Sequence, residues 1–124
     1  MLKHKKRYDM RDLNFGSLNI DYVYEVEDFV RPGETIQCKR YNTFCGGKGL
    51  NQSIALANAG ATLYHAGKIG PDGIILKERL ASAGVKTSFI KVTNEPTGHA
   101  IIEIWKFGDV GTYVAFLFEM ATPR

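Results

Sequence analysis

The spacing of apolar and polar residues predicts short strands at the start of the chain. Residues 12–17 form a short apolar segment closed by small residues, which suits a buried strand that ends in a loop. Residues 22–26 and 36–41 are rich in β-forming residues and partly alternate, and residues 31–34 favour a turn between them. These two stretches predict a small antiparallel pair of strands.

The middle of the chain alternates helical and strand patterns. Residues 50–59 and 74–83 favour helices, and each segment is followed by a glycine where a helix would end. Residues 63–69 and 87–92 are typical of core strands. The order strand, helix, strand, helix, strand predicts a parallel α/β sheet with right-handed crossovers.

The last part of the chain predicts a β-hairpin. Residues 99–105 and 112–118 are β-rich and flank the turn-forming segment 108–111, and the second arm is unusually apolar. No internal repeat, low-complexity tract or long linker interrupts the sequence, which favours a single domain.

The composition is that of one soluble globular domain, with 44% apolar and 23% charged residues among 124. An enzyme with two lobes and two substrates usually needs roughly twice as much chain. Residues 1–12 hold five basic and two acidic side chains, whereas residues 13–124 hold eleven of each. No basic face with interleaved aromatic residues follows, so we interpret residues 1–12 as a solvated basic leader and expect no nucleic-acid partner.

The same sequence gives little sign of export or of membrane insertion. No apolar run follows the basic leader, and no stretch approaches the roughly 20 apolar residues that cross a bilayer. We therefore expect a cytoplasmic protein without a membrane partner. Cys38 and Cys45 are the only cysteines, and without a secretion signal we expect reduced thiols rather than a disulfide or a metal site.

Asn19 and Asp21 are the first candidates for ligand binding. They follow the first predicted strand in Gly16-Ser17-Leu18-Asn19-Ile20-Asp21, and their spacing of two residues lets both side chains project the same way. A carboxylate accepts hydrogen bonds from hydroxyls, and an amide both donates and accepts, so the pair suits the vicinal hydroxyls of a sugar. The alternative is that both residues only shape a turn.

A glycine-rich segment is the second candidate. Residues 46–52 read Gly-Gly-Lys-Gly-Leu-Asn-Gln at a predicted helix start, where free backbone amides and the helix dipole can receive an oxygen-rich ligand. A nucleotide P-loop needs Ser or Thr after its lysine, whereas Gly49 follows Lys48 here. The segment also lacks the G-x-G-x-x-G spacing of a dinucleotide site. A purely structural glycine turn remains the alternative.

Together these two motifs resemble the ribokinase-like, or PfkB-type, carbohydrate kinase family. Residues 32–35 resemble the family's lid turn, residues 67–73 its G-x-[IV]-G-x-D-x-x-G region, and residues 96–100 its lid return. The resemblance implies an α/β fold, Rossmann-like, with a parallel sheet, flanking helices and a small antiparallel β lid, incomplete in this chain. It implies a basic leader over 1–12, the N-terminal part of the kinase domain over 13–104, and a divergent tail over 105–124.

The resemblance also implies site residues. Sugar binding is expected from Asn19, Asp21, Gly47, Lys48 and Asn51. The lid strand that covers the sugar is expected to contribute Thr97, Gly98 and Ala100, with Ile101 serving lid packing. Asp72 and Gly73 are expected to be structural, as a loop and a helix cap.

As a family member, the intact protein would transfer the ATP γ-phosphate to a primary hydroxyl of ribose or a similar sugar. It would use ATP, Mg²⁺ and a monovalent cation, with a small-molecule sugar as partner, and would form a homodimer through its lid strands. The family's catalytic aspartate lies in a C-terminal G-A-G-D region, and its ATP site in the same later half. None of these groups is assigned to a residue of this chain, so we expect no catalysis by the chain alone.

Two further hypotheses follow from the sequence. The tail beyond residues 104–105 lacks the family's G-A-N-like segment, which suggests a shifted reading frame or a truncation. A partial sheet would also expose an edge and an apolar face.

The competing functions are a catalytically inactive fragment that binds sugar or self-associates, and, much less favoured, dinucleotide binding.

Overall fold

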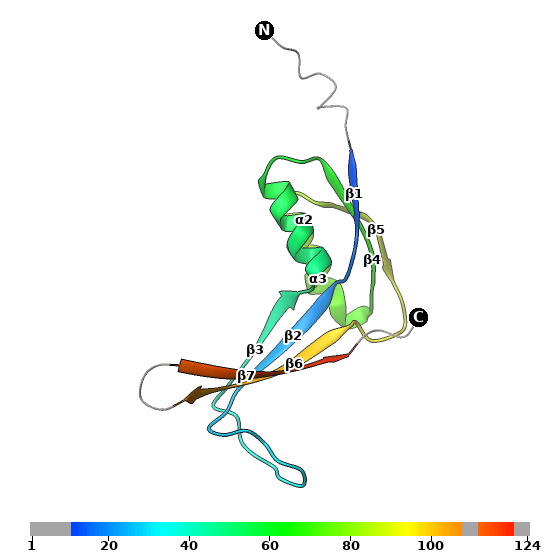
Figure 1. Cartoon of the computed structure of the whole chain (residues 1–124). Coiled ribbons are helices and arrows are strands. Elements are labelled where there is room, and N and C mark those ends of the chain that lie inside the picture. The colour runs from blue at the N-terminus through cyan, green and yellow to red at the C-terminus, as the bar shows by residue number, and fades with distance from the viewer. Residues whose placement is uncertain (1–10, 108–111, 121–124) are drawn as a thin grey trace.

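A three-stranded parallel sheet carries the two helices. The computed structural model describes residues 11–107 and 112–120 (Figure 1). Sheet A has the order β1-β4-β5, and both of its strand pairs are parallel, as the sequence predicts. Its strands are β1 (Asp12–Phe15), β4 (Leu63–Ile69) and β5 (Lys86–Val92). The helical elements are α2 (Lys48–Asn58), the 3₁₀ turn η1 (Pro71–Gly73) and α3 (Ile74–Ser82).

A second sheet extends away from sheet A and the helices (Figure 1). Sheet B has the order β3-β2-β6-β7. Strand β2 pairs antiparallel with β3 and parallel with β6, and β6 pairs antiparallel with β7. The predicted hairpin is thus confirmed, although its turn lies outside the described residues. The strands are β2 (Asn19–Glu25), β3 (Arg40–Gly46), β6 (His99–Phe107) and β7 (Thr112–Met120).

One predicted strand is displaced along the sequence. Residues 36–39 belong to a loop, and β3 begins only at Arg40. The reason is its register with β2, which pairs Glu25 with Arg40 at one end and Asn19 with Gly46 at the other. Pairing with a neighbouring strand outweighs the β propensity of the residues themselves.

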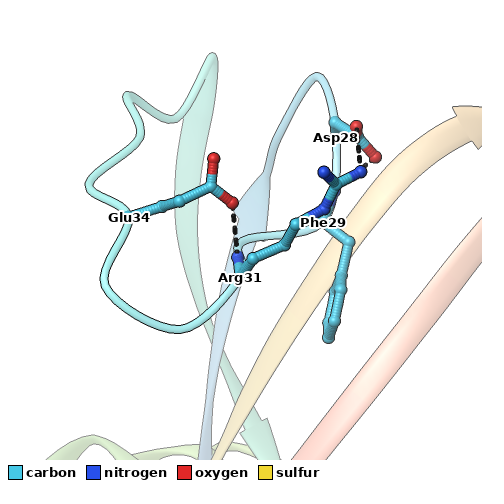
Figure 2. A network of polar contacts seen from close by, with 4 residues as sticks. All are labelled: Asp28, Phe29, Arg31 and Glu34. Atoms are coloured by element: carbon cyan, nitrogen blue, oxygen red, sulfur yellow. Dashed lines mark hydrogen bonds and ion pairs between the residues drawn. The ribbon is translucent and has the colours of Figure 1, made fainter.

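The turn between β2 and β3 forms where the sequence predicts it. The backbone N–H of Glu34 donates to the carbonyl of Arg31 at 3.0 Å, and the Arg31 N–H donates to Glu34 Oε1 at 2.9 Å (Figure 2). The Arg31 guanidinium lies 4.0 Å from the exposed carboxylate of Asp28 (Figure 2). The ring of Phe29 lies 5.9 Å from that of Trp105, so the turn also contacts the far part of β6.

The main core lies between the helices and one face of sheet A, and it continues under the start of β2. Burying a side chain such as Leu or Ile stabilises the fold by roughly 1.5–3 kcal/mol. Both helices end where the sequence predicts, because Gly60 and Gly84 follow them with φ of 96° and 92°. The core residues are Leu18, Ile20, Leu50, Leu63, Ile69, Leu76, Leu80, Val85 and Ile90.

The opposite face of sheet A exposes apolar side chains. Leu13, Phe15 and Phe89 are 62%, 81% and 58% exposed, and the Phe89 ring lies 5.2 Å from that of Tyr64 on β4. Parallel sheets in α/β proteins are normally covered on both faces. Among the described residues, helices cover only one face of sheet A, so the exposed face expected from the sequence is present. No helix in the described ranges is both long and apolar enough to cross a bilayer.

This face predicts concentration-dependent self-association. The double variant Phe15→Ser, Phe89→Ser should shift the protein toward monomer in sedimentation velocity, because it removes two aromatic groups from one patch. Leu56→Ser is the matched control, since Leu56 is 43% exposed but lies on α2. A wild-type protein that stays monomeric at high concentration would contradict the prediction.

Candidate functional site

A cavity of about 450 Å³ lies where the start of β2, the start of α2 and strand β6 come together. This volume is within the range of small-molecule sites. Six of the eight candidate site residues from the sequence line it. The lining residues are Ser17, Asn19, Asp21, Gly47, Lys48, Asn51, Ala100 and Ile102.

Strand β2 presents Asn19 and Asp21 to this cavity. Side chains alternate along a strand, and Ile20 between them points into the core with 2% exposure. A slip of one residue would expose Ile20 and bury the two polar side chains, so core packing sets which face meets the cavity. Asn19 and Asp21 thus share one face of β2, as their spacing predicts, and they lie in a strand rather than in a turn.

Lys48 and Asn51 enter the cavity from the first turn of α2. They are three residues apart and therefore lie on one side of the helix. Gly47 precedes the helix with φ of 103°, and a Cβ there would lie 2.5 Å from the Ser17 carbonyl oxygen. Only glycine combines this backbone conformation with so close an approach.

The backbone amides at the start of α2 are not all free for a ligand, contrary to the sequence expectation. The Leu50 N–H donates to the Ser17 carbonyl at 3.1 Å, and the Gly49 N–H donates to Ser17 Oγ at 3.5 Å. The glycines therefore bring two backbone segments into contact. The polar groups offered to the cavity are mainly side chains.

Gly46 has a role that the sequence analysis did not assign. A Cβ on Gly46 would lie 2.5 Å from Asp21 Oδ2 and 2.8 Å from Oδ1. Gly46 thus leaves room for the Asp21 carboxylate beside β3. The pair of adjacent glycines in the sequence was a sign of this role. Gly47 is needed for the start of the helix, and Gly46 is needed to make room for a neighbouring side chain.

Strand β6 supplies the apolar wall of the cavity. Ala100 pairs with Asp21 and Ile102 with Val23 in the parallel register with β2. The sequence predicted Ala100 and missed both Ile102 and Ser17. Ile101 alternates to the other face of sheet B, where it lines a different hollow with Tyr22 and Tyr24.

Thr97 and Gly98 are not among the residues that line the cavity. Thr97 is 1% exposed, and both its hydroxyl and its N–H donate to Asp72 Oδ1, at 2.6 and 3.0 Å. The Gly98 carbonyl accepts a hydrogen bond from the Ile20 N–H at 3.0 Å. Both residues lie directly before β6 and make hydrogen bonds to segments next to it.

Asp72 is structural, as expected, but it does not cap α3. The helix begins after Gly73, with no side-chain capping bond, and the Asp72 carboxylate turns instead to Thr97. Partial desolvation of the carboxylate would raise the pKa of Asp72, but the hydrogen bonds from the Thr97 hydroxyl and amide outweigh it and hold the pKa below its usual range.

A buried polar network joins sheet A and the loop before β2 to α2. His65 Nε2 lies 3.0 Å from the Gly16 carbonyl, which can only accept, so Nε2 carries the proton. Nδ1 then accepts from the Ser53 hydroxyl at 2.7 Å. Asn14 Nδ2 donates to Ser53 Oγ and to the Gly49 carbonyl, both at 3.0 Å. Strands β1 and β4 are thereby tied to α2 by a neutral histidine.

The family model for pfkB carbohydrate kinases matches residues 13–113. The chain belongs to this family. It is 40% identical to the ribokinase of Haemophilus influenzae over 94 residues, which cover 73% of this chain and 31% of that protein. It is 38% identical to the ribokinase of Arabidopsis thaliana over 98 residues, covering 75% of this chain and 26% of that one.

Solved structures confirm the ribokinase-like fold. The ribokinase of Cryptococcus neoformans var. grubii serotype A, in complex with ADP, matches with a TM-score of 0.75 and 43% identity, covering 87% of this chain and 34% of that one. The Arabidopsis thaliana ribokinase complexed with ribose and ATP matches with a TM-score of 0.65 and 31% identity, covering 87% and 35%. The chain therefore spans about a third of the ribokinases that it matches.

The residues described here do not provide a metal centre. Within 11–107 and 112–120, no three His, Cys, Asp or Glu side chains gather in a way that would hold a metal ion.

The His65 network predicts a pH-dependent stability. Burial lowers the pKa of His65 from its ordinary value of 6.5, so below that pH the unfolded chain binds more protons than the folded one. The free energy of unfolding should therefore fall as the pH drops from about 6.5 toward 5. Urea titrations at several pH values measure this slope.

The variant His65→Gln is the control for this slope, since its amide can donate to Gly16 and accept from Ser53 without titrating. It should flatten the fall in stability between these pH values. A variant with the same slope as the wild type would show that His65 is not responsible.

Proposed function

We propose that this chain forms the sugar-binding part of a ribokinase-type enzyme. The intact protein would transfer the γ-phosphate of ATP to a primary hydroxyl of ribose or a similar sugar. The observation that carries this proposal is a single cavity that combines one carboxylate, two amides and one ammonium group with an apolar wall. Convergent polar groups facing an apolar surface are typical of a small polyhydroxy ligand.

The side chains divide the recognition of a sugar between them. Asp21 carries only acceptors when ionised, so it suits two neighbouring hydroxyls, whereas Asn19 and Asn51 each donate and accept. Lys48 donates from the same side as Asn51. Ala100 and Ile102 offer methyl groups to the C–H side of a ring.

The ATP part of the proposal rests on the relatives. One matched ribokinase was solved with ADP and another with ribose and ATP. ATP, Mg²⁺, the monovalent cation and the catalytic base are proposed to belong to the part of the family domain that this chain does not span. The binding residues named above hold and orient the sugar, and none of them is assigned the transfer of a proton.

We also propose that the protein is located in the cytoplasm.

The second candidate function is a catalytically inactive piece that binds sugar or associates with itself. It is favoured by the apolar face that sheet A exposes. Self-association through sheet B, as a homodimer of lid strands, is part of the same proposal. Formation of ADP by the purified intact protein with ribose and ATP separates the two functions, since only the kinase produces it.

Substitution of Asp21 is expected to weaken sugar binding. Asp21→Asn should weaken ribose binding about 10-fold or more in calorimetric titration, because a hydrogen bond to a charged group is worth about 1.5–3 kcal/mol. Asp28→Asn is the matched control, since Asp28 is an exposed carboxylate in the turn between β2 and β3. Equal affinities for the two variants would remove Asp21 from the site.

A substitution at Gly46 is expected to weaken ribose binding while the protein still folds. Gly46→Ala should weaken ribose binding by about an order of magnitude, because the new methyl group displaces the Asp21 carboxylate. The melting temperature should change little, since a flexible side chain gives way rather than the backbone. In an Asp21→Ala background the same substitution should add no further loss. A further loss there would show that Gly46 acts by another route.

A further inference from the structure

A closed set of hydrogen bonds joins the segment before β6 to the turn before α3. The Gly70 N–H donates to Thr97 Oγ1 at 2.8 Å, and the Thr97 hydroxyl donates to Asp72 Oδ1 at 2.6 Å. The Thr97 N–H donates to the same carboxylate oxygen at 3.0 Å. We call these three bonds the Asp72–Thr97 latch. The threonine hydroxyl uses its only proton and also accepts, so each bond strengthens the other.

The backbone around the latch is packed too closely for side chains. A Cβ on Gly70 would overlap the Glu95 carbonyl oxygen, and a Cβ on Gly73 would overlap the Thr97 hydroxyl. Two glycines therefore let the segment 95–97 lie directly against η1. Thr97 is buried at this contact, and its hydroxyl and N–H are both hydrogen-bonded. Leaving either group without a partner in such a buried position would cost free energy.

The latch stands next to the strand that forms the apolar wall of the cavity. Residues 93–98 cross from sheet A to sheet B, between the end of β5 and the start of β6. The Gly98 carbonyl, one residue after Thr97, accepts from Ile20 on β2. Ala100 follows two residues later, opposite Asp21. The path from the latch to the cavity is thus a few residues of one strand.

We propose that Asp72 is a positioning residue for the sugar cavity: it holds Thr97 and so fixes β6, which keeps Ala100 and Ile102 opposite Asn19 and Asp21. This proposal rests on the sugar-binding function proposed above. Asp72 itself is exposed and does not line the cavity, so it acts through Thr97 and β6. A displacement of about 1 Å in such a wall is enough to weaken a site markedly.

Four variants of the full chain test the latch by ribose titration. Asp72→Asn keeps the shape but loses the charge, and Thr97→Val removes the hydroxyl. Both should bind ribose about 10-fold more weakly. Thr97→Ser keeps the hydroxyl and should bind nearly as the wild type. Glu78→Gln is the charge control, since Glu78 is an exposed acid on α3. Equal binding by Asp72→Asn and Glu78→Gln would overturn the proposal.

A second measurement needs no sugar. Amide hydrogen exchange at residues 99–102 should become faster in Asp72→Asn, whereas exchange in β4 should stay unchanged. Equal acceleration in β4 would indicate a general loss of stability and would overturn the proposal, as would unchanged exchange at 99–102. If Thr97→Val fails to fold, Asp72→Asn and Thr97→Ser give the same comparison.

The two measurements separate the latch from the proposed function. If the wild type binds no ribose, the proposed function fails, and exchange alone decides the latch. Faster exchange confined to 99–102 would then support Asp72 as the residue that positions β6. If the wild type binds ribose and both measurements match the control, the function stands and the latch is wrong.

Discussion

The rest of this structure depends on the direct contact between two backbone segments, residues 16–17 and 47–49. A Cβ on Gly49 would overlap the backbone of Gly16, and one on Gly47 would meet the Ser17 carbonyl. The glycines therefore allow α2 to begin against the loop that leads into β2. Because Asn19 and Asp21 follow this loop, and Lys48 and Asn51 follow the helix start, one backbone contact brings together polar groups about 30 residues apart.

Two polar clusters support this contact from different sides. Asn14, Ser53 and His65 lie below the loop and tie sheet A to α2 by hydrogen bonds at 2.7–3.0 Å. Asp72 and Thr97 tie sheet A to the strand that forms the other wall. Buried polar groups are costly when unpaired, so each cluster specifies one relative placement of its elements. The cavity is formed at the junction of the two sheets, where small shifts of either sheet change its shape.

Two observations support different parts of the proposed function: the side chains that line the cavity, and the match to known carbohydrate kinases. The polar side chains that face Ala100 and Ile102 in one cavity carry the proposal that this chain binds a sugar. The match to pfkB carbohydrate kinases shows the family of this chain, and phosphoryl transfer by the whole protein is a proposal drawn from that match. Sheet A also exposes an apolar face, whereas parallel sheets are normally covered on both faces.

The sequence by itself determined the elements and the family. Residues 63–69 were predicted as a strand with the observed bounds, since apolar spacing and flanking turns are local signals. The glycine motif and the Asn19, Asp21 pair likewise lie within short stretches, and five binding residues predicted from them line one cavity. Local patterns carry such information because each depends on neighbours a few positions away.

Only the tertiary structure decided how distant segments meet. It moved β3 to Arg40–Gly46, because pairing with β2 outweighs local propensity. It turned Thr97 inward to Asp72, and it used two helix-start amides for Ser17 rather than for a ligand. The contacts of Thr97 and Ser17 join residues 25–33 positions apart, and no spacing rule along the chain encodes their distance or direction. Which polar group meets a ligand and which meets another segment is therefore settled by packing.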